Sequence, residues 1–181
     1  MTETPDTVLE FWFSELGPKD RFAKSDELDQ LITKRFSSLH LALSRDVPSE
    51  WRASAEARLA LVIVLDQFPR NMYRGSPMAF ATDTLALNQA KAALAVGADT
   101  EVEENRRLFF YLPFEHAENL AEQDRAVALC EALGNEQFLD FAHQHRELIE
   151  RFGRFPHRNS ILGRTSTAEE KAYLAEPGAG F

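Results

Sequence analysis

The feature that most constrains the fold is a run of seven apolar residues, Leu59–Leu65, which leads directly into a polar segment. Periodicity alone would also allow a buried strand. However, the preceding residues Ala55–Arg58 have high helical propensity, and the combined length exceeds that of a usual strand. We therefore predict a central helix that is apolar on all sides.

Two polar segments stand out, and we name them the first elbow (Leu65–Gly75) and the second elbow (Arg154–Asn159). The first should contain the end of the central helix and the turn after it. The second follows another helical pattern and is itself followed by Gly163 and Arg164. Each contains a Phe-Pro pair, which needs no function of its own because proline stops a helix while phenylalanine anchors the turn in the core.

Apolar periodicity, capping residues and breakers predict helices along the rest of the chain. Pro69 and Pro113 are expected to end helices. The predicted ranges are about 5–13, 25–44, 53–65, 77–97, 100–112, 117–133, 135–152 and 167–174. The last of these should begin with a capping box formed by Ser166 and Glu169. The sequence therefore predicts an all-α fold, an array of about seven to eight helices in antiparallel pairs, in a single domain (residues 1–181) with a frayed tail (residues 175–181).

Composition and charge exclude several classes of protein. The net charge of −9 argues against general nucleic-acid binding, which needs a basic face. The N-terminus is acidic and no long apolar run follows it, so we expect no signal peptide, no membrane span and a cytoplasmic location. Cys130 is the only cysteine, which allows no internal disulfide, and its apolar neighbours indicate a buried helix residue.

Three motifs in order along the chain resemble a known family. They are Leu65–Gly75 with Ala79–Ala81; Tyr111–Phe114 with His116 and Glu118; and His145–Arg146 with Arg151–Asn159 and Leu162–Arg164. Together they resemble the bacterial family catalogued as domain of unknown function 924. The resemblance implies an all-α fold similar to tetratricopeptide-repeat-like helical arrays, although the 34-residue consensus of that repeat is not visible here. It carries over no established activity, and the cofactor, if there is one, stays unknown. In the middle motif the family commonly has Met and Ser where this chain has Glu115 and Ala117.

Three residues are candidates for catalysis. Asp66 lies on the same helical side as buried apolar residues, so its carboxylate should be at least partly buried. It could be a structural partner of an arginine or a backbone amide, or a general base. His145 lies in an apolar stripe with Phe141 and Leu148, where it could be a hydrogen-bonded core residue or a proton donor or acceptor. His116 is available for the same chemistry.

The sequence places arginines close to predicted helix N-termini, whose backbone amides are free, and this combination predicts an anion-binding site near the elbows. Both elbows lead toward a helix N-terminus, which presents a positive dipole end, and arginine offers a fork suited to carboxylate or phosphate. Ordinary capping with solvated arginines is the alternative. The candidate ligand-binding residues are Arg70, Asn71, Arg74, Glu118, Arg154, His157, Arg158 and Asn159.

We predict no metal site from the sequence. A two-residue step on a helix turns His143 and His145 about 200° apart, so they cannot share one ion. His116 and Glu118 alone are too few ligands for zinc, so a metal could be held only if folding brought His116, Glu118, His145 or His157 together.

Two functions remain open. In the first, the two elbows converge on one small-molecule site, with Arg70, Arg154 and Arg158 holding an anionic group and Asp66, His116 or His145 transferring protons. In the second, the chain is a helical protein- or peptide-interaction module and the elbows are internal staples. Whether the protein is an enzyme, and its oligomeric state, are left open.

Overall fold

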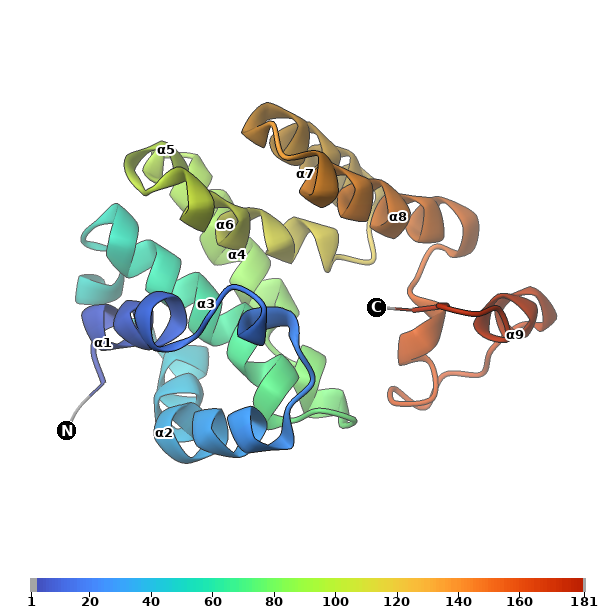
Figure 1. Cartoon of the computed structure of the whole chain (residues 1–181), viewed down its shortest axis with the longest axis horizontal. Helices are drawn as coiled ribbons and strands as arrows, with labels where there is room; N and C mark the ends of the chain where they lie inside the picture. The colour runs from blue at the N-terminus through green and yellow to red at the C-terminus, as the bar shows by residue number, and fades with distance from the viewer. Residues whose placement is uncertain (1–2, 181) are drawn as a thin grey trace. The chain divides into compact units, whose positions relative to one another are not determined.

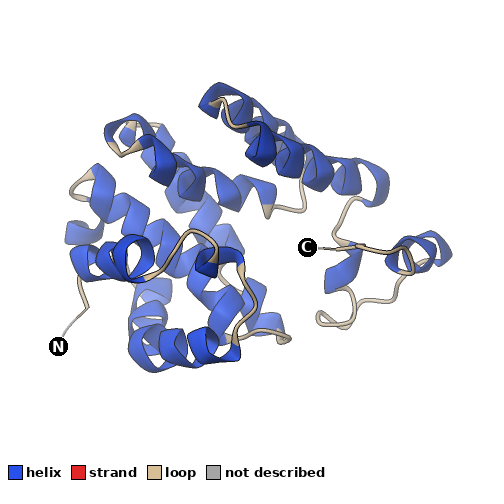
Figure 2. Ribbon diagram, in the orientation of Figure 1, coloured by secondary structure: helices blue, strands red, loops and turns tan. Residues whose placement is uncertain are grey.

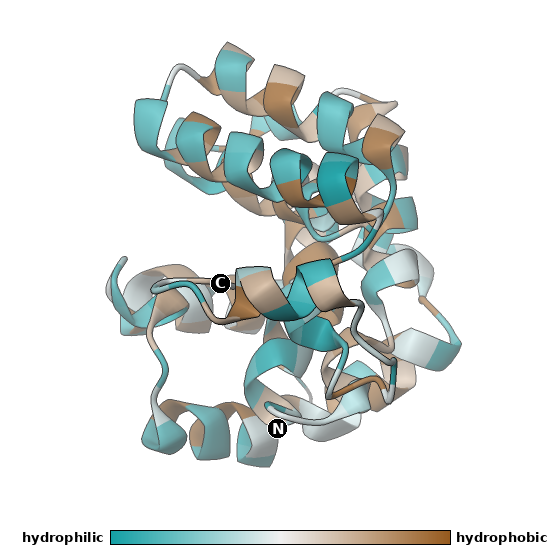
Figure 3. Ribbon diagram, turned by 90° about the vertical axis from the view of Figure 1, so that its right-hand side faces the viewer, coloured by the Kyte–Doolittle hydropathy of each residue, from teal (hydrophilic) through white to brown (hydrophobic). Residues whose placement is uncertain are grey.

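The computed structural model describes residues 3–180, and within them it contains helices and loops but no strand (Figures 1 and 2). The predicted all-α class is therefore confirmed. The described α-helices are α1 (Pro5–Glu10), α2 (Asp26–Arg45), α3 (Ala55–Met72), α4 (Asp83–Leu94), α5 (Ala98–Glu101), α6 (Glu104–Glu115), α7 (Leu120–Leu133), α8 (Glu136–Phe152) and α9 (Ala168–Leu174). Many helices carry both hydrophobic and hydrophilic stretches, as amphipathic helices do (Figure 3).

The chain forms two compact units. Unit 1 comprises Met1–Arg74 and Met78–Pro113, and unit 2 comprises Gly75–Pro77 and Phe114–Phe181. The first elbow thus lies almost entirely in unit 1 and the second in unit 2. The single domain expected for the whole chain stays a prediction.

Unit 1 is built around α3. Ser54 caps this helix by accepting a hydrogen bond from the backbone N–H of Ala57. Every residue from Leu59 to Pro69 is buried, as predicted for a helix that is apolar on all sides. Helices α1, α2 and α4 pack against it. A cluster of aromatic rings fills the core beside α3. Its members, which meet at tilted or edge-to-face angles, are Phe11, Trp12, Phe36, Phe68 and Phe109.

The first helix changes from α-helical to π-helical geometry at Phe11. Helix α1 continues as one π-helical turn, η1 (Phe11–Glu15), which buries Phe11 and Trp12. Arg21 donates hydrogen bonds to the carbonyl oxygens of Trp12, Phe13 and Leu16. These bonds satisfy carbonyls at the end of the π turn that the helix itself leaves without partners.

Helix α3 does not stop at Pro69, contrary to the expectation from the sequence. It runs on to Met72. Proline has no N–H to give to the carbonyl four residues earlier, that of Leu65. The hydroxyl of Thr82 instead donates to that carbonyl oxygen at 2.7 Å. A side chain from outside the helix therefore replaces the lost bond.

Helix α6 likewise continues past Pro113 to Glu115, so the prediction of a stop at Pro113 is wrong. The end of the helix is closed by Gln123, which is fully buried. Its amide nitrogen donates to the carbonyl oxygens of Phe114 (3.3 Å), Glu115 (2.7 Å) and Ala117 (2.8 Å). The two hydrogens of this amide satisfy the carbonyls of Glu115 and Ala117, while the carbonyl of Phe114 also accepts from the backbone N–H of Ala117.

Unit 2 pairs α7 with α8 and ends in α9. Its core contains Leu148, Ile149 and Phe155, with Phe152 and Tyr173 packed against them. Phe141 is 42% exposed, so the apolar stripe predicted on α8 is not buried along its whole length. The capping box of α9 is formed by Thr167 and Glu170, one residue later than predicted.

The last described residues fold back on the second elbow. The backbone N–H of Gly180 donates to the hydroxyl of Tyr173 at 3.1 Å. A Cβ atom at Gly180 would lie 3.1 Å from Cβ of His157, so this glycine sits directly on the histidine. Residues 175–181 were expected to be frayed, and that expectation about their motion stays a prediction.

Candidate functional site

The first elbow holds its arginines in ion pairs with carboxylates of unit 1. Arg70 donates to both oxygens of Asp83, at 2.9 and 3.2 Å, and to the carbonyl oxygen of Asp66 at 2.7 Å. The carboxylate of Asp66 lies 3.5 Å from the same guanidinium and accepts a hydrogen bond from the side chain of Gln67. Asp66 is fully buried, in agreement with the prediction. Its contacts explain how a buried carboxylate is tolerated there.

A second set of contacts in unit 1 ties the end of α3 to α2. Arg74 makes a bidentate ion pair with Asp29, and Asn71 donates to the same carboxylate at 2.8 Å. Burial opposes ionisation of Asp29, but the hydrogen bonds from Arg74 and Asn71 prevail and lower its pKa. Side chains predicted to bind a ligand are thus engaged with the protein's own carboxylates.

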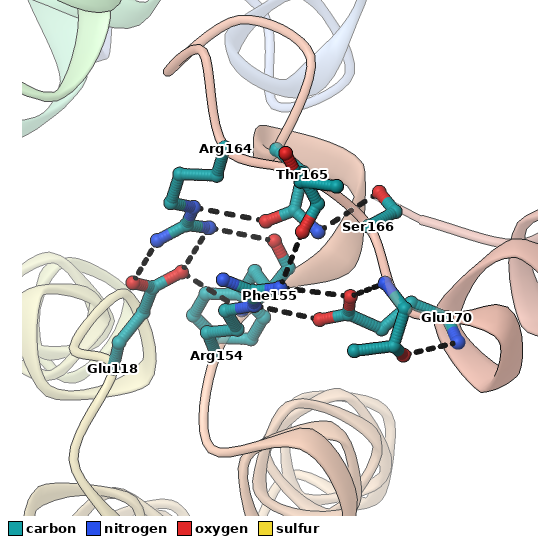
Figure 4. A network of polar contacts seen from close by, with 9 residues as sticks. Glu118, Arg154, Phe155, Arg164, Thr165, Ser166 and Glu170 are labelled. Carbon is teal, nitrogen blue, oxygen red and sulfur yellow. Dashed lines mark hydrogen bonds and ion pairs between the residues drawn. The ribbon is translucent and has the colours of Figure 1, made fainter.

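The second elbow is held by two further ion pairs in unit 2 (Figure 4). Glu118 accepts from Arg164 through both oxygens, at 2.6 and 2.9 Å, and also from the backbone N–H of Phe155 at 2.8 Å. Arg154 pairs with both oxygens of Glu170, at 2.7 and 2.9 Å. We call this set of ion pairs the elbow staple.

Further bonds close the loop between the second elbow and α9. Arg164 also donates to the side chain of Asn159, and Asn159 donates to the hydroxyl of Ser166. Arg154 donates to the carbonyl oxygen of Thr165. The hydrogen bond from Arg154, followed by that from the backbone of Thr167, lowers the pKa of Glu170 to about 2. Asn159, Arg154 and Glu118 therefore stabilise the shape of the loop.

A second group of side chains in unit 2 lies on or next to the ring of Phe155. We call it the histidine cluster, and its members are Glu115, His116, His145, Phe155, His157 and Arg158. The ring of His145 meets Phe155 edge to face with 5.6 Å between centroids, and the ring of His157 lies 5.6 Å from it on centroids. The guanidinium carbon of Arg158 lies 4.5 Å from the same centroid.

His116 joins the cluster through its backbone and its ring. Its carbonyl oxygen accepts a hydrogen bond from Arg158 at 3.1 Å, and its ring centroid lies 6.4 Å from that of His145. The chain thus brings together side chains from the end of α6, the middle of α8 and the second elbow. Four of the residues predicted from the sequence, His116, His145, His157 and Arg158, lie within this one cluster.

Glu115 is the member of the cluster that was not predicted as a site residue. Its side chain is only 3% exposed, and its Oε2 lies 3.8 Å from Nδ1 of His145. The thiol of Cys130 donates to its Oε1 at 3.4 Å. Burial, reinforced by Glu115, raises the pKa of Cys130, so the cysteine stays a protonated thiol at neutral pH and is a hydrogen-bond donor rather than a nucleophile. Glu115 directly precedes the candidate His116 in the sequence, and this proximity could have indicated that it belongs to the same site.

Two imidazoles of the cluster are neutral at neutral pH. Burial lowers the pKa of His145 to about 3. Burial, and then the neighbouring charge of Arg158, lower the pKa of His157 to about 4. The cluster therefore combines a permanent cation, Arg158, with neutral rings that can each accept or donate a hydrogen bond. Within residues 3–180, no group of three or more His, Cys, Asp and Glu side chains is arranged to hold a metal ion.

Comparison with known proteins gives the chain a family. The model of a family described as bacterial protein of unknown function (DUF924) matches residues 8–178. A solved structure of a protein of unknown function from Agrobacterium tumefaciens is similar to this chain, with 44% sequence identity and a TM-score of 0.90. The similarity covers 94% of this chain and 96% of that one. No curated protein matches the sequence. None of the helices within residues 3–180 has the length and apolar character needed to cross a bilayer.

Proposed function

The chain belongs to the bacterial DUF924 family, and from that premise we propose that it binds a small anionic molecule at the histidine cluster of unit 2. The observation that carries the proposal is the convergence of Arg158, His145 and His157 on the ring of Phe155, with His116 beside His145. A guanidinium offers paired donors to a carboxylate or phosphate, and imidazoles beside it can complete the hydrogen bonds of such a ligand.

The contacts of Arg158 support this choice of site. Arg70, Arg74, Arg154 and Arg164 each pair with a carboxylate of their own unit, which satisfies most of their donors. Arg158 donates to a carbonyl oxygen and lies against an aromatic face. These two contacts fix the orientation of its guanidinium beside the ring of Phe155.

The proposal divides the predicted residues by role. Arg158, His116, His145 and His157 bind the ligand in unit 2, and the histidines are available for proton transfer. Glu118, Arg154 and Asn159 hold the loop that presents Arg158. Binding roles for Asp66, Arg70, Asn71 and Arg74, together with the convergence of the two elbows on one site, stay predictions.

Thermal unfolding tests the proposal. Wild type and Arg158→Ala are heated with inorganic phosphate, methyl phosphate, acetate and citrate. A ligand that binds only the folded state should stabilise it by about 2.7 kcal/mol at a hundred times its dissociation constant, or roughly 5 to 10 °C for a chain of this length. We expect at least one anion to raise the midpoint of wild type and to leave that of Arg158→Ala unchanged.

Arg151→Ala is the matched control. This arginine lies at the end of α8, pairs with Glu169 on the surface and has an aromatic contact of its own with Phe152. It should respond to anions as wild type does. If no anion shifts wild type and Arg158→Ala is itself strongly destabilised, the cluster is a structural staple, and the helical interaction module becomes the better explanation.

A further inference from the structure

Phe22 is an exposed aromatic side chain that the fold of unit 1 holds in place. It is 57% exposed, yet its ring is stacked on that of Phe109, with 6.1 Å between the centroids and 10° between the planes. Phe109 is itself almost fully buried and meets Phe13 edge to face. The ring of Phe22 is therefore anchored on one side, while the other side faces solvent.

Arg21, the neighbour of Phe22, carries a charge that no carboxylate neutralises. Its Nε and Nη2 donate to three backbone carbonyl oxygens in and just after η1. The carboxylate of Asp20 accepts instead from the backbone N–H of Gly17, at 2.9 Å. Among residues 3–180, Arg21 has no ion-pair partner, and its Nη1 has no hydrogen-bond acceptor. The backbone thus fixes this guanidinium and leaves one of its nitrogens for a partner.

A second arginine adds positive charge beside the first. The guanidinium carbons of Arg21 and Arg106 each lie 4.9 Å from the centroid of the Phe13 ring. Arg106 has its own carboxylate partners, Glu103 at 3.2 Å and Glu56 at 3.6 Å. Burial, and then the charge of Arg106, lower the pKa of Arg21. An anion beside Arg21 would oppose both effects.

The segment around these two residues is basic, in contrast to the chain as a whole. Residues 19–24 contain three cations, Lys19, Arg21 and Lys24, and one carboxylate, that of Asp20, in a chain of net charge −9. Both lysines are exposed. We call residues 19–24 the basic aromatic patch. Arginine and aromatic side chains are the types most enriched at protein interfaces and among the residues that dominate their affinity.

We propose that the basic aromatic patch docks an acidic segment of a partner protein, in which a carboxylate lies next to an aromatic side chain. The carboxylate pairs with Arg21 and is attracted by the two lysines, while the aromatic ring packs on the open face of Phe22. Because the fold already holds Arg21 and Phe22, little of their conformational freedom is lost on binding.

The charge of the chain favours a short segment over an extended anionic surface such as a membrane. A membrane would face much of a molecule whose net charge is −9, whereas a short segment meets the patch alone. The patch lies in unit 1 and the histidine cluster lies in unit 2. The inference therefore goes beyond the proposed anion-binding function and can fail without it.

Three short peptides test the inference. The probe, acetyl-EDFDE-amide, has both features, whereas acetyl-EDADE-amide lacks the ring and acetyl-QNFNQ-amide lacks the charges. Each is titrated into the wild-type chain at millimolar concentrations, and ¹H–¹⁵N NMR spectra are recorded. We expect the probe to shift the backbone signals of residues 19–24 and to bind at least about fivefold more tightly than either control peptide. Equal affinities for the three peptides, or shifts confined to unit 2, would refute the inference.

Phe22→Ser and Leu41→Ser are matched variants of unit 1. They remove side chains that are 57% and 49% exposed, so both should fold. Leu41 lies roughly 20 Å along α2 from the start of that helix, which follows the patch in sequence. Phe22→Ser should weaken binding of the probe at least about fivefold, and Leu41→Ser should leave it unchanged. Equal affinities of the two variants for the probe would count against the patch.

Reversing charge at the lysines tests the electrostatic part without disturbing the hydrogen bonds of Arg21. The double variant Lys19→Glu, Lys24→Glu should bind the probe about tenfold more weakly than wild type. Unchanged affinity would show that the patch does not select acidic segments.

Vesicles of phosphatidylserine and phosphatidylcholine test the competing occupant. We expect the wild-type chain to stay in the supernatant when they are sedimented. If the chain sediments with the vesicles, loses this binding in Phe22→Ser and shows no response of residues 19–24 to the probe, the patch contacts membranes and the inference is wrong.

Discussion

At the scale of single residues, some buried backbone carbonyls accept hydrogen bonds from side chains that are distant along the chain. The clearest case is the carbonyl oxygen of Leu65, which loses its helical partner to Pro69 and gains the hydroxyl of Thr82. Because this hydroxyl gives its hydrogen to Leu65, the 3.2 Å contact between Thr82 Oγ1 and His40 Nε2 must use a proton on the histidine. A chain of hydrogen bonds therefore runs from α2 through Thr82 to α3.

Replacing Thr82 with valine should lower the free energy of unfolding by about 1 to 3 kcal/mol, because it leaves a buried carbonyl without a partner at nearly unchanged volume. Thr82→Ser keeps the hydroxyl and serves as the control, with a smaller loss. Urea unfolding of the two variants and wild type measures the difference. Equal stability of the valine and serine variants would show that the hydroxyl is not what allows α3 to pass Pro69.

At the scale of elements, the sequence predicted the helices and burial that follow from local patterns. It did not predict the helix ends that depend on side chains distant along the chain. The burial of α3 follows from its composition and is confirmed, and the helix begins at Ala55, close to the predicted start near residues 53 and 54. Helix α3 continues past Pro69, where the hydroxyl of Thr82 replaces the lost hydrogen bond. Helix α6 continues past Pro113, and Gln123 donates to the carbonyls at its end. Neither partner could be assigned without the packing of the helices.

The candidate site shows the same division. His116, His145, His157 and Arg158 were predicted from the sequence, because histidine and arginine side chains are chemically distinctive. Their contacts with one another and with Phe155 were not predicted, since these arise when α6, α8 and the second elbow pack together. The ion pairs of the arginines could not be predicted from the sequence either, because a partner such as Asp29 lies 45 residues from Arg74.

The elbow staple joins the second elbow to α9 and to the segment that precedes α7. Its contribution to stability can be measured by replacing Glu118. Glu118→Gln removes the charge that pairs with Arg164 and keeps an acceptor for the N–H of Phe155. Both side chains of this pair are about three-quarters buried. We expect a loss of about 2 kcal/mol in the free energy of unfolding, less than for a fully buried pair.

Glu169→Gln provides the comparison for Glu118→Gln. It breaks the ion pair between Glu169 and Arg151, whose side chains are 60% and 44% exposed. An exposed pair of this kind contributes at most about 1 kcal/mol. Guanidinium unfolding curves of the two variants should therefore differ clearly in midpoint. If the losses are equal, the staple contributes no more than an ordinary surface pair.

At the scale of the whole molecule, several buried groups make stability depend on pH in the same direction. Burial lowers the pKa of His40, of His145 to about 3 and of His157 to about 4, all from an ordinary value of 6.5. Glu118 acts at lower pH: burial opposes its ionisation, but hydrogen bonds from Arg164 and from the N–H of Phe155 hold its pKa below 4.5. The folded chain therefore binds fewer protons than the unfolded chain from about pH 6.5 downward.

Stability should consequently fall as the pH is lowered from 6.5 toward 4. In that window the unfolded histidines are protonated and the buried ones are not, so the free energy of unfolding rises with pH. Each fully shifted histidine contributes up to about 1.4 kcal/mol per pH unit. Below about pH 4.5 the paired carboxylates add to the loss, since they are protonated first in the unfolded chain. Urea unfolding at pH 7, 6, 5.5 and 5 measures this slope.

His145→Phe identifies the share of the slope that belongs to the histidine cluster. The variant lacks one buried imidazole, so its free energy of unfolding should depend less steeply on pH between 6.5 and 5, by up to about 1.4 kcal/mol per pH unit. His143→Phe, the same change at an exposed position on α8, supplies the reference slope. Identical slopes for the two variants would mean that His145 is protonated to the same extent in the folded and unfolded chains.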